Sequence, residues 1–290
     1  MGAVVGIALT MTLLAATDAL GAATARGARA ATSTLGPGDH TITLVVGRLS
    51  RSLILHVPPR AAIAHRPLLL IYHGISGTAR GTEQETDFAR VADRSGELVA
   101  FMQGYQNSWN EGTGHSPAAL AHINDVGYTL AAIAKLERLV AFDRSRIVAV
   151  GFSNGALMVE DLGCKIAGRL AMIVPVEGEL ATTMAASCRP ARPISVYEVH
   201  GTADTAIRFG GGPINGNGPV VLSAPKSIAR WAHLDHCAPR ATTTPTRSSI
   251  RLTSYARCRR SVTARLRVIV GGVHQWGSNI GEVVAAVVPK

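Results

Sequence analysis

Aromatic and charged residues are scarce in this 290-residue sequence, at 4% and 17%, whereas hydrophobic residues make up 47%. No segment combines high charge with low hydropathy, which excludes a disordered chain. No internal repeat or linker divides the sequence, and its length suits one large globular domain. Cysteines with the C-x-x-C spacing of zinc sites are also lacking, so a structural zinc is not expected.

A hydrophobic run long enough to cross a membrane is missing near the start. The apolar stretch Val4–Ala16 falls short of the roughly 20 residues that a span needs. It has the length of a signal-peptide core and precedes two cleavage-like sequences, Ala23-Thr24-Ala25 and Ala28-Arg29-Ala30. No positive charge precedes it, so a retained anchor is the alternative, and no cysteine is there to carry a lipoprotein acyl group.

We therefore expect residues 1–25, or as far as residue 30, to be a signal peptide and residues 26–290 to be a single domain. The mature chain should be secreted or held in the cell envelope, without stable insertion in a membrane.

Acidic residues are fewer than basic ones, 19 against 29, which gives a formal net charge of +10. The arginines are scattered, and the densest group, at 251–267, lacks the interleaved aromatic residues of a single-strand binder. Nucleic acid is therefore not an expected partner. We interpret the basic residues as a solvated face, with weak adhesion to an anionic envelope or polymer as the alternative.

The four cysteines all follow the expected signal segment. An even number in an exported chain favours disulfides, and four cysteines allow three pairings. The local pairing of Cys164 with Cys188 and Cys237 with Cys258 is the simplest. Each such bridge would stabilise the fold by roughly 3 kcal/mol in the chain-entropy model.

Strand-like and helix-like segments alternate along the chain, which predicts an α/β fold with a mostly parallel, eight-stranded sheet flanked by helices. The expected strands are Thr41–Val46 and Ser52–Val57, which form an antiparallel pair, then Pro67–Tyr72, Leu98–Met102, Arg146–Val150, Ala171–Val176, Ile194–Val199 and Ala264–Val270. The expected helices are Glu83–Arg94, Asp125–Phe142, Ala156–Ile166, Pro225–Leu234 and a short last one at Gly281–Val288.

A candidate nucleophile stands in the sequence Gly151-Phe152-Ser153-Asn154-Gly155, between a strand and a helix. A sharp strand-to-helix turn exposes the serine Oγ and strains its backbone, and the flanking glycines avoid collisions with the neighbouring strand and helix. The helix N-terminus also favours developing negative charge. The alternative is an ordinary serine that caps a helix.

A serine hydroxyl needs a base, and the base needs a carboxylate that orients it. Asp204 follows the strand Ile194–Val199, and His274 follows the strand Ala264–Val270, so the order of serine, acid and histidine is that of α/β-hydrolases. His233, His236 and Asp235 are weaker candidates because they lie at the end of a helix. The alternative without a catalytic role is that Asp204 is an ordinary turn aspartate and His274 an ordinary loop histidine.

An oxyanion hole requires two backbone N–H donors. We assign one to Asn154, which follows the nucleophile, and the other to Ile75 in the loop after the third strand, with Gly74 and Ser76 as alternatives. We interpret His73 as a structural loop histidine. The glycine-rich loop at 210–218 should lie near the site because it follows Asp204 closely.

The chain resembles the secreted esterases that are similar to polyhydroxybutyrate depolymerases and feruloyl esterases, grouped as carbohydrate esterase family 1. The resemblance covers roughly residues 40–277. It rests on HGISG at 73–77, YQNSWN at 105–110, DVGY at 125–128, GFSNGALM at 151–158, HGTAD at 200–204, WAHLDHC at 231–237 and GGVHQW at 271–276. The resemblance implies the α/β-hydrolase fold, the triad Ser153, Asp204 and His274, and disulfides.

This sequence departs from the family after the histidine, where His-Thr-Trp-Pro is replaced by His274-Gln275-Trp276-Gly277. The wall of the substrate site can therefore differ. Trp109 and Trp276 are candidates to stack on an aromatic acyl group, a sugar or a polyester, with plain packing as the equal alternative.

Together these features predict a serine carboxylic ester hydrolase that works through an acyl-enzyme, without cofactor or metal, as a monomer. The expected substrate is a polyhydroxyalkanoate-type polyester or a feruloyl or acetyl polysaccharide ester, polymeric or small. An acyltransferase of the same fold, a peptidase and a non-catalytic protein that binds an envelope or polymer are the alternatives.

Overall fold

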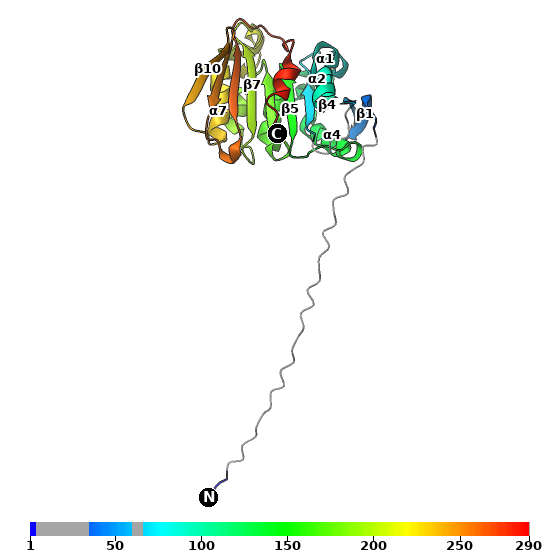
Figure 1. Cartoon of the computed structure of the whole chain (residues 1–290), viewed down its shortest axis with the longest axis vertical. Helices are drawn as coiled ribbons and strands as arrows, with labels where there is room; N and C mark the ends of the chain where they lie inside the picture. The colour runs from blue at the N-terminus through cyan, green and yellow to red at the C-terminus, as the bar shows by residue number, and fades with distance from the viewer. Residues whose placement is uncertain (4–34, 60–65, 290) are drawn as a thin grey trace. The chain divides into compact units, whose positions relative to one another are not determined.

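Segments rich in leucine and β-branched residues assemble into one large twisted sheet in the computed structural model, which describes residues 1–3, 35–59 and 66–289. Within those ranges the sheet has ten strands. Their order is β1 (Gly38–Val46), β2 (Leu49–Val57), β4 (Leu98–Met102), β3 (Leu68–Tyr72), β5 (Ile147–Phe152), β6 (Met172–Val176), β7 (Ser195–Gly201), β12 (Ala264–Ile269), β11 (Ile250–Tyr255) and β10 (Ala241–Arg247). Strands β1 and β10 form the two edges (Figure 1).

The central strands β4, β3, β5, β6, β7 and β12 run parallel to one another. Strands β3, β4 and β6 are buried along their whole length, as expected for a parallel sheet covered on both faces. The pairing of β1 with β2 is antiparallel, as predicted. The carboxyl ends of β5, β7 and β12 therefore meet at one end of the sheet, where the candidate catalytic residues follow.

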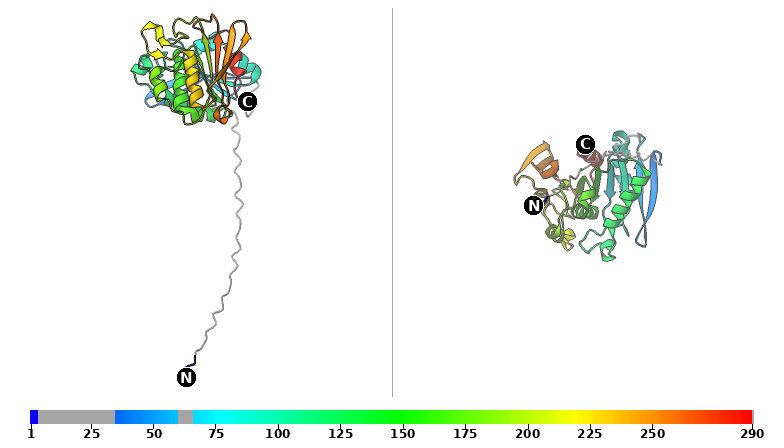
Figure 2. Two further views of the ribbon diagram at one scale, coloured as in Figure 1. Left: turned by 90° about the vertical axis from the view of Figure 1, so that its left-hand side faces the viewer. Right: turned by 90° about the horizontal axis from the view of Figure 1, so that it is seen from below.

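Helices cover both faces of the sheet (Figure 2). The helices are α1 (Ala79–Glu85), α2 (Phe88–Ser95), α3 (Pro117–Leu120), α4 (Asp125–Leu139), α5 (Asn154–Ile166), α6 (Thr182–Ser187), α7 (Ala224–Leu234) and α8 (Ile280–Ala285). Apolar residues of α4, α5 and α7 pack on one face, and those of α1, α2 and α8 pack on the other.

The predicted α/β-hydrolase architecture is confirmed, but the sheet has two more strands than the eight expected. All eight predicted strands are present, and β10 and β11 extend the sheet beyond β12. Strand β10 is exposed on every residue, so it lacks the alternating hydrophobic pattern by which a strand is recognised. Its Pro245 is tolerated because an edge strand leaves one side unpaired.

The helix expected at Glu83–Arg94 is two helices, because the backbone becomes extended at Thr86 and restarts after Asp87. The helix predicted to run to Phe142 ends earlier, at Leu139, and the last helix spans Ile280–Ala285.

Two disulfides with the local pairing hold segments beside α5 and α7. Cys164 in α5 is bonded to Cys188, which follows α6, and Cys237 after α7 is bonded to Cys258. Across the described parts of the chain, we find no helix of the length and apolarity that a membrane crossing needs. The expected signal peptide, residues 1–25, lies outside the described residues apart from the first three.

Candidate active site

Ser153 occupies the sharp turn between β5 and α5, with the left-handed φ of 55° and ψ of −118°. A non-glycine residue in this region of backbone space is strained, as expected for an exposed nucleophile on a strand-to-helix turn. Its N–H donates to the Val176 carbonyl oxygen at 3.0 Å, which ties the turn to the end of the neighbouring strand. This hydrogen bond to the sheet therefore helps to maintain the strained backbone conformation of Ser153.

The two glycines that flank Ser153 are required by close backbone contacts. A Cβ on Gly151 would lie 2.0 Å from the Gly155 carbonyl oxygen, and a Cβ on Gly155 would lie 2.2 Å from the Tyr72 carbonyl oxygen. Both distances are far inside van der Waals contact, so the strand, the turn and the helix can approach only without these side chains.

His274 lies between Ser153 and Asp204 and within hydrogen-bond distance of both. Its Nε2 is 3.0 Å from the Ser153 Oγ, and its Nδ1 is 2.6 Å from the Asp204 Oδ2. The sequence separations are 121 and 70 residues, so only the parallel sheet brings the three together. This geometry suits a base that accepts the serine proton while the carboxylate orients its ring.

Asp204 is buried, and its second oxygen accepts hydrogen bonds from the N–H groups of Ala206 and Ile207 at 2.8 and 2.9 Å. Burial by itself would raise the pKa of Asp204, but the hydrogen bond and charge of His274 and the Ile207 N–H outweigh it, so the pKa lies below its ordinary value. The carboxylate therefore stays ionised beside His274 at neutral pH.

The backbone N–H groups of Ile75 and Asn154 are the predicted oxyanion donors. Neither donates to another group among the residues that the structure describes. Asn154 begins α5, where N–H groups point out of the helix, and Ile75 lies in the loop after β3 with 54% of its surface exposed. Both residues line the cavity beside Ser153, so their N–H groups are available to a developing oxyanion.

A cavity of about 430 Å³ opens beside Ser153 and His274. Its apolar wall comes from Ile75, Phe152, Leu157, Ile207, Ile214, Ala206 and Pro219, and its polar wall from Glu111, His115, Ser116, Asn215 and Asn217. The glycine-rich loop at 210–218 contributes to this wall, as predicted from its position after Asp204. The volume lies within the usual range for small-molecule sites.

Comparison with known proteins points to esterases. A feruloyl esterase B of Piromyces equi is 31% identical to this chain, over 73% of this chain and 40% of that protein. NocK of Nocardia uniformis subsp. tsuyamanensis, which has esterase in its name, is 29% identical over 58% of this chain and 49% of its own length. The solved structure of an acetyl xylan esterase from Aspergillus awamori superposes with a TM-score of 0.59 at 11% identity, over 85% of this chain and 97% of that one.

The chain has the α/β-hydrolase fold, and its sequence is similar to those of proteins named as esterases. It spans less than half the length of these two curated relatives. No family model matches it.

Trp109 is fully buried and does not line the cavity, so of its two predicted roles the stacking role is wrong and the packing role holds. Its indole N–H donates to the His73 carbonyl oxygen at 2.8 Å, and its backbone N–H donates to the Asn154 Oδ1 at 2.8 Å. Trp109 therefore joins the loop that carries Ile75 to Asn154 at the start of α5, the two expected oxyanion donors.

His73 is buried and structural, as predicted. The Gly104 N–H donates to its Nε2 at 3.0 Å, and its Nδ1 donates to the Gly74 carbonyl oxygen at 2.7 Å. Burial lowers the pKa of His73, although the hydrogen bond to Gly74 opposes this. The neutral ring thus fixes the loop that precedes Ile75.

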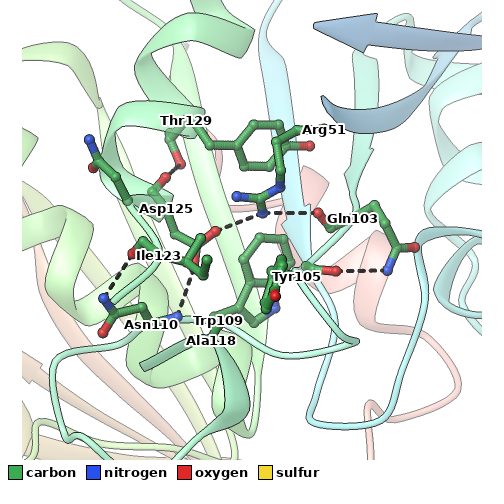
Figure 3. A network of polar contacts seen from close by, with 12 residues as sticks. Arg51, Gln103, Tyr105, Trp109, Asn110, Ala118, Ile123, Asp125 and Thr129 are labelled. Atoms are coloured by element: carbon green, nitrogen blue, oxygen red, sulfur yellow. Dashed lines mark hydrogen bonds and ion pairs between the residues drawn. The ribbon is translucent and has the colours of Figure 1, made fainter. Parts of the chain in front are cut away.

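The loop with Trp109 is held from behind by a buried ion pair (Figure 3). The Arg51 guanidinium donates to the Asp125 Oδ1 at 2.7 Å and to the Gln103 carbonyl oxygen at 3.2 Å. The other Asp125 oxygen accepts from the Asn110 N–H at 2.8 Å. This network fixes the residue that follows Trp109.

Trp276 also packs inside the protein and does not line the cavity at Ser153, so the structure gives it a packing role. Its ring lies 5.2 Å from the Phe152 ring and 5.9 Å from the Phe88 ring, measured between centroids. Phe152 in turn contacts the His274 ring at 4.8 Å. Trp276 therefore packs against the Phe152 ring, which in turn supports the His274 ring.

The weaker candidates for the base and the acid, His233, His236 and Asp235, lie outside the cavity at Ser153. Asp235 is buried at the end of α7 and accepts the Ile194 N–H at 2.9 Å, which ties that helix to the segment before β7. His233 and His236 flank this residue and are not among the residues that line the cavity.

Sequence reasoning missed a buried polar cluster next to Asp204, formed by Glu177, Glu179 and His200. The signal that could have found it is VEGEL at 176–180, two glutamates in an apolar setting directly after a buried strand. Donor atoms of Glu177, His200 and Asp204 lie within 4.8 Å of one another. They are already engaged by Gly201, Ile207 and His274, so we assign no metal to them.

Replacing Trp109 by phenylalanine is expected to remove the indole hydrogen bond to His73 while it keeps most of the packing. A buried carbonyl left without its donor costs about 1–3 kcal/mol, so the free energy of unfolding should fall by that amount. Because the loop that carries Ile75 loses this hydrogen bond, whereas the backbone bond from residue 109 to Asn154 is kept, kcat should fall more than KM rises. Urea unfolding and steady-state kinetics measure the two effects; an unchanged kcat would contradict the bracing role.

Proposed function

We propose that this chain is a secreted serine esterase that hydrolyses carboxylic esters through Ser153, His274 and Asp204. The observation that carries the proposal is the position of His274, whose two ring nitrogens lie 3.0 Å from the Ser153 Oγ and 2.6 Å from the Asp204 Oδ2. The esterase names of the two curated relatives support the same activity.

The mechanism follows from this arrangement. His274 accepts the proton of Ser153 as the Oγ attacks the ester carbonyl, and Asp204 stabilises the charged ring. The backbone N–H groups of Asn154 and Ile75 bind the oxyanion. The alcohol leaves with the proton from His274, and water activated by the same histidine then releases the acid from Ser153.

The cavity favours an uncharged acyl group. Its apolar wall, with Ile75, Leu157, Ile207 and Ile214, suits an aromatic or short aliphatic acyl chain. The buried carboxyl group of Glu111, on the polar wall, disfavours an anionic substrate there. We assign the substrate to feruloyl or acetyl esters of polysaccharides or to polyhydroxyalkanoate-type polyesters, and the disulfides suit an extracytoplasmic enzyme.

The test is turnover of p-nitrophenyl acetate, butyrate and octanoate and of methyl ferulate, together with labelling by a fluorophosphonate probe and mass mapping of the labelled residue. Labelling at Ser153 with ester turnover is the expected result. An anilide of the carboxylic acid of one of these esters separates an esterase from a peptidase, because we expect this enzyme to hydrolyse the ester and not the anilide. Acyl transfer to an added alcohol in preference to water would instead identify an acyltransferase, and a folded protein without turnover or labelling would indicate a binding protein.

A further inference from the structure

A cluster of ionisable side chains, Glu177, Glu179 and His200, lies next to Asp204 and does not line the cavity at Ser153. A carboxylate oxygen of Glu177, one of Asp204 and the His200 Nε2 lie within 4.8 Å of one another. Glu177 and His200 are 2% and 1% exposed, so water does not screen the cluster. Glu177 has no part in the mechanism described above.

The backbone places the Glu177 side chain with little freedom. Glu177 follows β6 directly and has a left-handed φ of 50°, which is strained for a residue with a side chain. Its N–H donates to the Val199 carbonyl oxygen at 2.9 Å, and both of its carboxyl oxygens lie 3.0 Å from the Gly201 nitrogen. A Cβ on the next residue, Gly178, would lie 3.0 Å from the Ser153 carbonyl oxygen. This segment is therefore held between the nucleophile turn and β7.

The ionisable groups that face Glu177 come from β7, from the loop after β7 and from the segment of Glu177 itself. His200 on β7 lies 3.3 Å away, and Asp204 comes from the loop that follows β7. Glu179 is on the same segment as Glu177 and contacts the far ring nitrogen of His200. His274, from the loop after β12, reaches the cluster only through Asp204.

The charges in this cluster do not balance if every acid is ionised. The His200 Nε2 lies 2.9 Å from the Ile207 carbonyl oxygen, so this nitrogen carries a hydrogen, while the other faces Glu179. Asp204 must remain ionised to orient His274. A second carboxylate beside it, buried and without its own cation, is strongly disfavoured. Burial, opposed by His200 and the Gly201 N–H and reinforced by Asp204, raises the pKa of Glu177 to about 8.

We propose that Glu177 is a positioning residue that acts as a neutral acid through Asp204: its proton is shared with the Asp204 carboxylate, which keeps that carboxylate directed at His274. When Glu177 ionises, the shared hydrogen bond is lost and its charge repels Asp204, so Asp204 no longer directs the His274 ring towards Ser153. The triad therefore loses activity at alkaline pH. This inference rests on the serine esterase function proposed above.

The test compares the parent with Glu177→Gln from pH 5.5 to pH 10 by titrating the acid released from methyl ferulate. Glutamine keeps an acceptor for the Gly201 N–H and a donor for Asp204, but it cannot ionise. In the parent we expect kcat to fall about tenfold per pH unit above a midpoint of about 8, with KM little changed. In Glu177→Gln the fall should be absent, with kcat at pH 7 within about threefold of the parent.

Glu179→Gln is the matched control, since Glu179 is equally buried on the same segment but faces the far side of His200. This variant should keep the alkaline fall. If Glu177→Gln keeps the fall of the parent, or is inactive at every pH although folded, Glu177 does not act as proposed.

A readout that needs no activity separates this inference from the function itself. The folded pKa of Glu177 lies above its unfolded value near 4.5, so the folded state holds the proton more tightly. Its contribution to stability is complete below about pH 4.5 and is lost as the pH rises towards about 8. If the parent chain shows no turnover at any pH, the proposed esterase function is refuted. If Tm declines equally with pH in the parent and in Glu177→Gln, the proposal that Glu177 is a neutral acid is refuted. A flatter decline in the variant would support that proposal.

Discussion

Replacement of Ser153 by alanine is expected to lower kcat for ester hydrolysis on the order of 10⁵-fold and to leave KM within a few-fold of the parent. The Oγ is the only atom removed, and its contact in the structure is with the His274 Nε2 at 3.0 Å. The oxyanion donors and the cavity wall remain, so binding persists while the acyl-enzyme cannot form. A small residual rate over water should survive.

The measurement is steady-state kinetics on p-nitrophenyl butyrate with fluorophosphonate labelling as a second readout. Ser248→Ala is the matched control, because Ser248 is exposed in the turn between β10 and β11, and its turnover should equal that of the parent. Thermal unfolding should show that both variants fold. A purified Ser153→Ala protein that keeps more than about 1% of the parent kcat would refute Ser153 as nucleophile.

Replacement of Arg51 by methionine should have the largest effect on stability, about 3–5 kcal/mol. The side chains of Arg51 and Asp125 are 4% and 0% exposed, so the substitution leaves a buried carboxylate without its cation. The guanidinium also lies 4.0 Å above the Tyr128 ring, and that contact is lost too. Since Asp125 holds the Asn110 N–H beside Trp109, kcat should fall as well.

The loss of stability in Arg51→Met should grow with pH. Burial raises the pKa of Asp125 and Arg51 opposes this, so without Arg51 the folded pKa rises further above the unfolded one. A proton then neutralises Asp125 at low pH, and stability is lost as the pH rises through the folded pKa. Urea unfolding at pH 5 and pH 8 measures the difference, and Arg51→Met combined with Asp125→Asn should regain part of the loss.

Arg94→Met is the control for the removal of an arginine from an ion pair. Arg94 and its partner Glu282 are each 52% exposed, so this substitution should cost no more than about 1 kcal/mol. If Arg51→Met were no more destabilising than Arg94→Met, the buried pair would contribute nothing to the fold.

Many features of the site were readable from short stretches of sequence because they depend on local backbone geometry. The strand Ile147–Phe152, the turn at Ser153 and the helix Asn154–Ile166 follow from one hydrophobic run, two glycines and one helical period. The order of Ser153, Asp204 and His274, each after a strand, requires only that parallel strands end on the same side. The signal peptide and the monomeric state stay predictions.

The errors arose where the role of a residue depends on what lies across the fold. The sequence of β10 does not alternate hydrophobic and polar residues, and this strand forms because its backbone can pair with that of β11. The sequence could present Trp109 equally as a stacking or a packing residue, and only the loop around it buries the indole against His73.

By itself the amino-acid sequence determined the α/β class, eight of the ten strands, the turn at Ser153 and the order of Ser153, Asp204 and His274 along the chain. Only the tertiary structure decided which polar groups are sealed from water, such as Arg51 with Asp125 and Glu177 with His200. The physical reason is that strand, turn and helix preferences are properties of neighbouring residues, whereas desolvation and charge pairing are set by side chains tens of residues apart that meet only when the sheet has formed.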